Sequence, residues 1–215
     1  IVYIMRITKY EHACLDVRDG TSRLVIDPGV YSGLFIDLAG IDALVITHVH
    51  ADHFDPDKIA AIIAQNPDVH VFATEEVAQQ LNRPGVTVPN REEPIAVGDL
   101  TLTFYGTEHA MIDPSYPAAQ NMGVLVNNVL YYPGDSFTMC PENYQILAVP
   151  IHAPWLKFSE TADFVRKSSA GKLFPAHNGF INDDGHALYT RLLTNVCTET
   201  NKELITLKPT ESVEL

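Results

Sequence analysis

The sequence Thr47-His48-Val49-His50-Ala51-Asp52-His53 places three imidazoles and a carboxylate within six residues. It follows a fully apolar segment that we expect to form a buried strand. Because alternate side chains of an extended chain point to the same face, His48 and His50 can converge on one metal ion. Asp52 and His53 lie where the strand gives way to a helix, so they can turn toward a second ion. We therefore expect a metal site here instead of a group of solvated loop histidines.

The composition is that of an ordinary globular protein. The chain has 215 residues, of which 46% are apolar and 19% charged, and we expect one domain over residues 1–215. No apolar run approaches the length of a membrane span, and the first residues do not resemble a signal peptide. Cys14, Cys140 and Cys197 are odd in number and have no C-x-x-C spacing, so we expect reduced thiols with a packing role. These features indicate a cytoplasmic protein.

The net charge of −13 restricts the class of partner. So acidic a surface repels polyanions, and neither Lys nor Arg is clustered along the chain. We therefore expect a small-molecule substrate, no nucleic acid and no membrane partner. Charge and apolar content do not distinguish a monomer from a homo-oligomer.

Strands and helices are expected to alternate along the chain. Strands are predicted at 4–10, 13–17, 23–26, 43–46, 69–73, 100–105, 145–150, 173–175, 203–207 and 212–215, with a hairpin over 124–132 and further short strands between 86 and 106. Helices are predicted at 58–65, after a Thr74 cap, from a Ser159-Glu160 cap to 167, and at 185–200. The first of these helices follows an Asp55 cap and Pro56, so it begins almost directly after His53.

Three further strand ends carry residues that can bind a metal. His109, Asp135 and His177 each follow a predicted strand. Each one alone is unremarkable, but residues at the same edge of a sheet converge on a cleft. Asp27 also ends a strand, and the sequence leaves two readings open for it. It is either a turn residue that caps its own backbone or a carboxylate that holds a metal-ligating histidine in the required tautomer.

These residues occur in the order of the five motifs of the metallo-β-lactamase superfamily, which the chain resembles over nearly its whole length. Asp27 matches the first motif, the His48–His53 stretch the second, His109 the third, Asp135 in Pro-Gly-Asp-Ser the fourth, and His177 in Pro-Ala-His-Asn-Gly the fifth. The segments Tyr-Glu-His-Ala-Cys-Leu, Leu-Val-Ile-Asp-Pro-Gly and Val-Pro-Ile-His are similar to those of the small hydrolases grouped with ascorbate-6-phosphate lactonase. The resemblance implies an α/β fold, a four-layer αβ/βα sandwich with a two-metal cleft at one edge of the sheets.

The resemblance also implies a ligand set. His48, His50 and His109 would hold the first ion, Asp52, His53 and His177 the second, and Asp135 would bridge the two. Imidazoles and carboxylates without a thiolate suit Zn²⁺, and they are also compatible with Mn²⁺, Fe²⁺ or Co²⁺. Two such ions would lower the pKa of a shared water, and the resulting hydroxide, oriented by Asp52, would attack a carbonyl or phosphoryl centre.

Four histidines remain outside this ligand set. His12 opens the second predicted strand, at a position where the resembled subgroup often has a histidine near the cleft, and His152 follows a strand end. For both we weigh equally a structural role and a catalytic role in contacting substrate or protonating the leaving group. His70 and His186 are expected to be structural or solvated. The sequence thus favours a metal-dependent hydrolase that cleaves a small ester, lactone or related carbonyl compound. The alternatives are a phosphodiesterase or nuclease that uses the same two metals, and a non-catalytic metal-binding module, which the complete ligand set disfavours.

Overall fold

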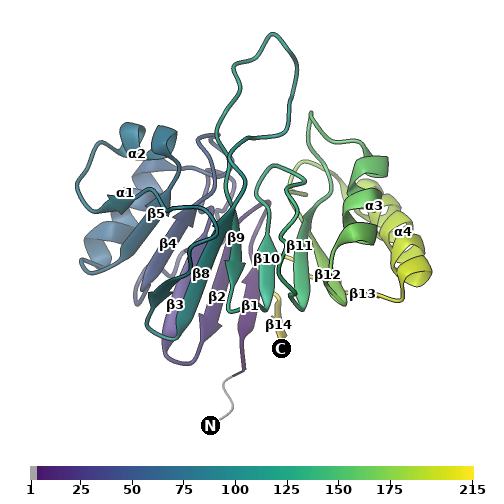
Figure 1. Cartoon of the computed structure of the whole chain (residues 1–215), viewed down its shortest axis with the longest axis horizontal. Coiled ribbons are helices and arrows are strands. Elements are labelled where there is room, and N and C mark those ends of the chain that lie inside the picture. Colours follow the sequence, from purple (N-terminus) through teal and green to yellow (C-terminus); the bar gives the residue numbers. More distant parts are fainter. Residues whose placement is uncertain (1–3) are drawn as a thin grey trace.

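Two seven-stranded mixed sheets face each other in the computed structural model, which describes residues 4–215 (Figure 1). The first sheet has the order β14-β1-β2-β3-β4-β5-β6, with strands at Ser212–Glu214, Arg6–Lys9, Leu15–Asp19, Ser22–Ile26, Ala43–Ile46, His70–Ala73 and Val86–Thr87. The second has the order β13-β12-β11-β10-β9-β8-β7, with strands at Glu203–Leu204, Lys172–Ala176, Ile146–Pro150, Leu130–Tyr132, Gly123–Val126, Leu100–Tyr105 and Ile95–Val97.

Helices cover the outer face of each sheet. α1 (Pro56–Gln65) and α2 (Glu75–Leu81) lie on the first sheet, and α3 (Phe158–Lys167) and α4 (Asp183–Thr200) lie on the second (Figure 1). The arrangement is the predicted four-layer αβ/βα sandwich.

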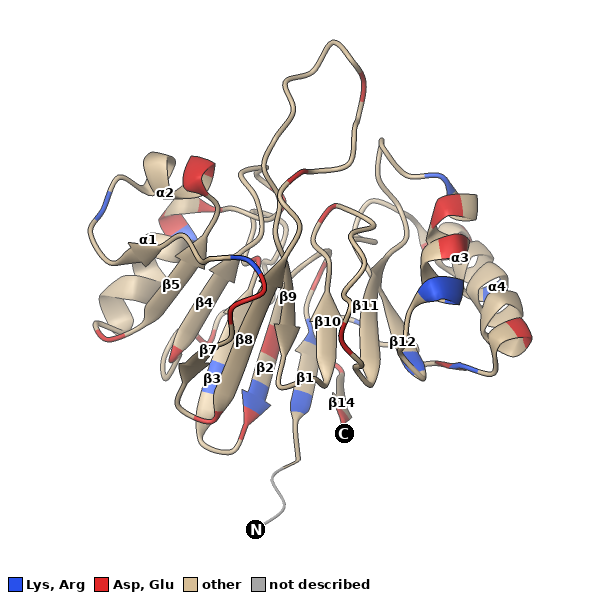
Figure 2. Ribbon diagram, viewed as in Figure 1, with Lys and Arg blue, Asp and Glu red and all other residues tan. Residues whose placement is uncertain are grey.

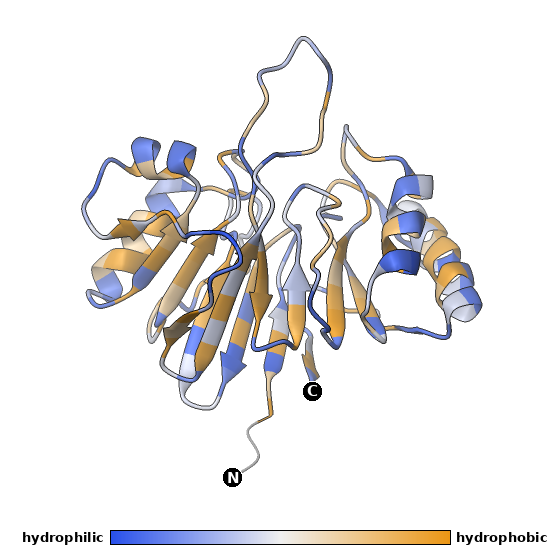
Figure 3. Ribbon diagram, viewed as in Figure 1, coloured by the Kyte–Doolittle hydropathy of each residue, from blue (hydrophilic) through white to orange (hydrophobic). Residues whose placement is uncertain are grey.

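Three apolar clusters hold the layers together. The largest lies between the sheets and includes Ile7, Leu102, Phe104 and Phe174. The other two pack each sheet against its helices. Central strands such as β4 and β11 are buried along their whole length, because both of their faces meet a layer, and Figure 3 shows both in hydrophobic colours. Burial of this kind is the main source of stability for such a sandwich.

Several element ends differ from the prediction. The prediction that Ser159 caps α3 was wrong, because the helix begins at Phe158, whose ring packs on the second-sheet cluster, and its N-cap is Lys157. α4 begins two residues before the predicted start, because the Asn182 side chain accepts a hydrogen bond from Gly185 N at 2.9 Å and caps the helix there. Thr74 does precede α2, but its side chain makes no capping hydrogen bond.

Two strands are shorter than predicted, because β1 covers only Arg6–Lys9 and the edge strand β13 only Glu203–Leu204. Residues 1–3, part of the segment searched for a signal peptide, lie outside the described residues. The three cysteines are free and buried, as predicted. Between residues 4 and 215, none of the helices has the length and apolar character needed to cross a membrane.

Parallel strands give the sandwich one functional edge. β3 and β4 run parallel in the first sheet, and β10, β11 and β12 run parallel in the second. β8 has the same direction as β10, because each is antiparallel to β9. The carboxyl ends of these strands therefore lie at one edge, and the long loop between β8 and β9 projects beyond it (Figure 1).

Candidate metal centre

Seven histidine and aspartate side chains meet at this edge. The loop after β4 supplies four of them, and the segments after β8, β10 and β12 supply His109, Asp135 and His177. Ligand atoms of His48, His50 and His109 lie within 4.8 Å of one another, and these residues are called the first group. Asp52, His53 and His177 form the second group, whose ligand atoms meet the same limit, and a ring nitrogen of His12 lies within that limit of them as well. The structure thus brings together every residue of the ligand set implied by the sequence resemblance.

Asp135 lies between the two groups. Its Oδ2 is 3.4 Å from His109 Nε2 and 3.1 Å from His177 Nε2, and its Oδ1 is 3.2 Å from His53 Nε2. A carboxylate that reaches both groups can serve two ions at once.

The buried ligand atoms have no hydrogen-bond partner within the described residues. They are the Nε2 atoms of His48, His53, His109 and His177 and the Oδ1 atom of Asp135. A buried polar atom without a partner is costly, and several converging ones indicate a missing cation. Four imidazole nitrogens and carboxylates form a donor set that fits Zn²⁺ and similar divalent ions. The residues present therefore fit a metal centre.

Hydrogen bonds at the other ring nitrogen set the tautomers. His53 Nδ1 lies 2.6 Å from Asp27 Oδ2, and His177 Nδ1 lies 2.6 Å from the His152 carbonyl oxygen. His109 Nδ1 contacts the carbonyl oxygen of Ala110. Because these partners are acceptors, each Nδ1 donates its proton, and in the neutral ring each Nε2 keeps a lone pair for a metal.

Asp27 supports the motif at three points. Besides binding His53, its carboxylate accepts hydrogen bonds from Thr47 N at 2.7 Å and Thr47 Oγ1 at 2.6 Å. Since that hydroxyl proton is directed at Asp27, Thr47 Oγ1 can accept a hydrogen bond from His48 Nδ1 at 3.0 Å. The buried Asp27 carboxylate therefore controls two of the ring orientations.

Gly29 lets the Asp27 turn pack against the motif loop. A Cβ atom on Gly29 would lie 2.0 Å from the carbonyl oxygen of Asp52 and 2.6 Å from His53 N. Val30 N also donates to the Ala51 carbonyl oxygen at 2.9 Å. The close backbone approach explains why a glycine follows Pro28.

His12 differs from the other histidines at this site. Its Nδ1 accepts a hydrogen bond from Gly179 N at 3.1 Å, so the ring proton is on Nε2, which lies 3.0 Å from Asp52 Oδ2. Burial lowers the pKa of His12 to about 4 despite the hydrogen bond to Asp52, so the ring is neutral. A neutral imidazole with its proton on Nε2 has no lone pair for a metal on that side. His12 therefore positions Asp52 and is not a ligand.

Trp155 contacts the centre from the second sheet. Its indole Nε1 donates a hydrogen bond to Asp135 Oδ2 at 2.9 Å, and its ring lies 6.0 Å from that of His109. No role is predicted from the sequence for Thr47, for Gly29 or for this interaction of Trp155. Thr47 and Gly29 adjoin motif residues, and Trp155 follows the buried strand β11. Their positions near strand ends are therefore the sequence feature that could have indicated a role at the site.

The remaining three histidines belong to neither group. His152 follows β11, and its ring lies 6.1 Å from that of Tyr189, while its carbonyl binds His177. Burial, with a smaller contribution from His177, lowers the pKa of His152. His70 is exposed at the start of β5, and His186 lies on the first turn of α4. The catalytic role predicted for His152 stays a prediction.

The carboxylates control the protonation of the second group. Burial alone would lower the pKa of His53 and His177, but Asp135 in both cases, with Asp27 for His53 and Asp52 for His177, outweighs it. The pKa of His53 is raised well above its ordinary value, and that of His177 to about 9. Burial instead keeps the pKa of His48 well below its ordinary value. In the absence of metal, the second group therefore holds protons near neutral pH, whereas His48 is neutral.

Charged residues are scattered over the rest of the fold. Figure 2 shows lysines and arginines singly or in short runs between acidic residues, without a continuous basic band on the side in view. The prediction that no nucleic acid binds stays a prediction.

Comparison with known proteins identifies the family. A protein-family model described as "Beta-lactamase superfamily domain" matches residues 6–177. Protein Rv0786c of Mycobacterium tuberculosis is 33% identical over 199 residues, which are 90% of this chain and 93% of that protein. UPF0173 metal-dependent hydrolase MJ1163 of Methanocaldococcus jannaschii is 30% identical over 139 residues, 60% of each chain.

A similar solved structure supports the same assignment. The metallo-β-lactamase fold protein YhfI from Bacillus subtilis matches with a TM-score of 0.73 at 18% identity, covering 100% of both chains. At this identity the likeness concerns the fold alone. The chain therefore belongs to the β-lactamase superfamily, and it has the metallo-β-lactamase fold of metal-dependent hydrolases.

Proposed function

We propose that this chain is a hydrolase that binds two divalent ions, with Zn²⁺ the best match, and cleaves a small ester, lactone or related carbonyl compound. The first group would hold one ion, the second group the other, and Asp135 both. When bound, such ions supply Lewis acidity and lower the pKa of water toward neutrality. The observation that carries the proposal is the convergence of buried, unpartnered ligand atoms on one edge of the sandwich.

Asp52 is the residue best placed to orient the nucleophile. It is the more exposed of the two carboxylates at the centre, with 19% of its side chain accessible against 4% for Asp135. The His12 ring proton holds Oδ2, which leaves Oδ1 free to accept a hydrogen bond from an attacking water. His152 is proposed to protonate the leaving group, because it is half-buried beside His177.

Elemental analysis of the purified protein is the first test of the proposal. We expect two equivalents of a transition metal in the wild type and fewer in His50→Ala. His70→Ala is the matched control, because it removes an exposed imidazole on the same sheet outside the centre. Trp155, the one tryptophan of the chain, gives a second readout, since its indole binds Asp135 and its fluorescence should change on metal addition. No bound metal and no change in fluorescence would refute the metal centre.

A substrate panel tests the chemistry separately. Simple lactones and esters should be hydrolysed in preference to bis-p-nitrophenyl phosphate, and Asp52→Ala should abolish turnover in a folded protein. Preference for the phosphodiester would favour the phosphodiesterase alternative. For His152, we expect His152→Ala to lose one limb of the pH–rate profile, and an unchanged profile would exclude it as the proton donor.

A further inference from the structure

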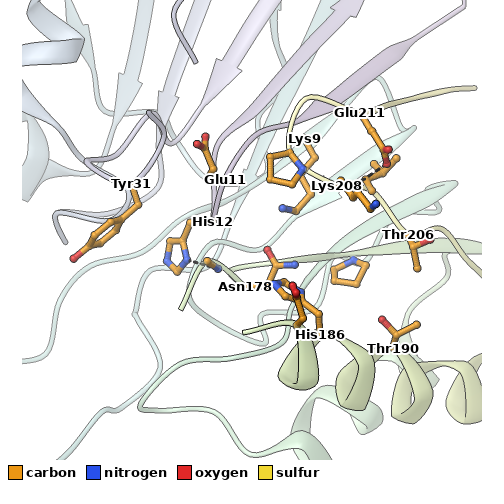
Figure 4. Close-up of a pocket in the computed structure, with 15 residues that line it drawn as sticks. Lys9, Glu11, His12, Tyr31, Asn178, His186, Thr190, Thr206, Lys208 and Glu211 are labelled. Carbon is orange, nitrogen blue, oxygen red and sulfur yellow. Dashed lines mark hydrogen bonds between the residues drawn. The ribbon is translucent and has the colours of Figure 1, made fainter. Parts of the chain in front are cut away.

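A cavity of about 900 Å³ lies beside the metal centre (Figure 4). The turn after β1, the loop after β12, one side of α4 and the segment between β13 and β14 form its walls. His12 is shared, because one side of its ring lines the cavity while its Nε2 contacts Asp52. A cavity of this size suits a small organic ligand. None of the seven proposed metal ligands lines it, so it is a compartment next to the centre.

Lys9 is the unusual residue of this cavity. It is only 2% exposed, yet within the described part of the chain its ammonium group makes a single hydrogen bond, to the carbonyl oxygen of Tyr10 at 3.0 Å. An ammonium group has three donors, and burying it without partners is costly. Among residues 4–215, Lys9 has no salt bridge to a carboxylate, and the charge of Glu11, which raises its pKa, does not outweigh burial. Burial accordingly lowers the pKa of Lys9 to about 8.

Two other lysines show how this chain normally satisfies a partly buried ammonium group. Lys58 Nζ donates to the Ser32 carbonyl oxygen at 2.7 Å, to Ser32 Oγ at 2.8 Å and to the Gly29 carbonyl oxygen at 3.3 Å. Lys202 Nζ donates to two carbonyl oxygens at 2.8 and 2.6 Å. Lys9 is more buried than either and has fewer acceptors. Its donors therefore remain available on the side of the cavity.

The acidic residues of the cavity wall do not accept hydrogen bonds from the Lys9 ammonium group. Glu11 accepts hydrogen bonds from Leu34 N at 3.1 Å with both oxygens, and Glu211 accepts one from Lys208 N at 2.9 Å. Asp183 stands across the cavity on the first turn of α4. Neither engaged carboxylate forms an ion pair with Lys9, so an external anion is the natural partner for its charge.

The opposite wall has a different character. Asp183, His186 and Thr190 are three and four residues apart on α4, so they share one face of the helix, and all three line the cavity. Figure 4 shows His186 and Thr190 on this helix, across the cavity from Lys9. These side chains can hydrogen-bond hydroxyl or amine groups. The α4 wall thus offers neutral and acidic groups, while both lysines of the cavity, Lys9 and Lys208, lie on the opposite wall together with Glu11 and Glu211 (Figure 4).

We propose that this cavity binds the anionic end of the substrate, a carboxylate or a phosphate paired with Lys9, while the α4 face binds polar groups of the same molecule. The proposal rests on the proposed hydrolase function only where it identifies the ligand as the substrate. Binding of an anion by Lys9 does not depend on that function. Shared contact with His12 places this end of the ligand next to Asp52. The substrate class is then a small, polar, anionic ester or lactone.

Calorimetric titration of the metal-loaded protein with succinate and with inorganic phosphate tests the anion site. Lys9→Met should weaken binding of one of them about ten-fold or more, and Lys9→Arg should weaken it less. Lys167→Met is the control, because it removes the same charge from an exposed position on α3 and should change nothing. The anion that loses affinity identifies the chemical class. Equal binding in Lys9→Met and wild type, or no binding of either anion to wild type, would overturn the proposal.

Two further measurements keep the test decisive. If Lys9→Met does not fold, the wild-type chain still reports through the rate at which Lys9 is acylated by an amine reagent, followed by peptide mass spectrometry. The anion should protect Lys9 and leave Lys167 unaffected, and lack of protection would contradict the site. Thermal unfolding of Lys9→Met should show no loss of stability, since a poorly compensated charge is removed.

Kinetics then separate the anion site from the hydrolase proposal. Monomethyl succinate carries a carboxylate that dimethyl succinate lacks, so Lys9→Met should raise KM for the first ester much more than for the second. If the wild type hydrolyses neither ester, the proposed substrate class fails, but the titrations still decide whether Lys9 binds an anion.

Discussion

The two sheets contribute to the metal centre in different ways. The first sheet supplies His48, His50, Asp52 and His53 from one continuous loop after β4. The second supplies His109, Asp135 and His177 from three separate strand ends. The first half is therefore assembled by local backbone, whereas the second exists only after β8, β10 and β12 have paired. A local motif can be read from the sequence, but Asp135, the residue that contacts both groups, reaches its place only in the assembled second sheet.

The largest effect should come from Asp135, the residue that contacts both groups. Asp135→Asn keeps the shape of the side chain but replaces a carboxylate that contacts both groups, so metal should be lost from both. We expect metal affinity to fall by more than about a hundred-fold, the upper range for outer partners of a metal site. His50→Ala, which changes only the first group, should keep about one equivalent. Two equivalents in Asp135→Asn by elemental analysis would contradict the bridging role.

A backbone substitution should damage the first half nearly as much. In Gly29→Ala, the new Cβ would stand 2.0 Å from the Asp52 carbonyl oxygen, so the motif loop must move. We expect a loss of about 1–3 kcal/mol in the free energy of unfolding, with weaker metal binding. Gly171→Ala is the matched control, because nothing lies within 4 Å of its added Cβ. Denaturant unfolding compares the two, and equal stabilities would show that the loop tolerates displacement.

Asp27 and Trp155 hydrogen-bond metal ligands of the first and the second sheet, respectively, so substitutions of these two residues compare the two sheets directly. Asp27→Asn removes a carboxylate that holds His53 and Thr47 on the first sheet, and Trp155→Phe removes the donor to Asp135 on the second. We expect metal affinity to fall about 10- to 100-fold in Asp27→Asn and by less in Trp155→Phe, which loses one neutral donor. Competition with a chelator measures both. The reverse order would mean that the second sheet controls the orientation of the ligands.

The smallest effect concerns protons. In the metal-free protein, His53 and His177 have a raised pKa, so both are protonated at pH 7, while His48 is not. Metal binding needs neutral imidazoles, so loading should release protons from the second group and affinity should fall as the pH falls. Calorimetry in buffers of different ionisation enthalpy measures the number of protons released on metal binding. Zero protons released at pH 7 would show that the second group is already neutral.

Much of the fold was legible in the sequence. The strand and helix alternation, the Asn127-Asn128 turn of the β9–β10 hairpin and the α1 cap by Asp55 all appear in the structure. Boundaries were less accurate, because Phe158 and Asn182 extend α3 and α4 through packing and capping that flanking residues alone did not reveal. Propensity identifies an element, and tertiary contacts decide where it ends.

By itself, the sequence determined the residues of the centre and their order, because metal-ligand chemistry restricts which side chains can occupy strand ends. Only the tertiary structure decided what each ring nitrogen does. His177 donates to the His152 carbonyl, Gly179 donates to His12, and Trp155 donates to Asp135, all across long stretches of chain. His12 is thus a positioning residue, although a structural and a catalytic role were both open for it, and Lys9, the last residue of β1, lines a cavity. Tautomer and burial depend on neighbours in space, which a linear pattern does not contain.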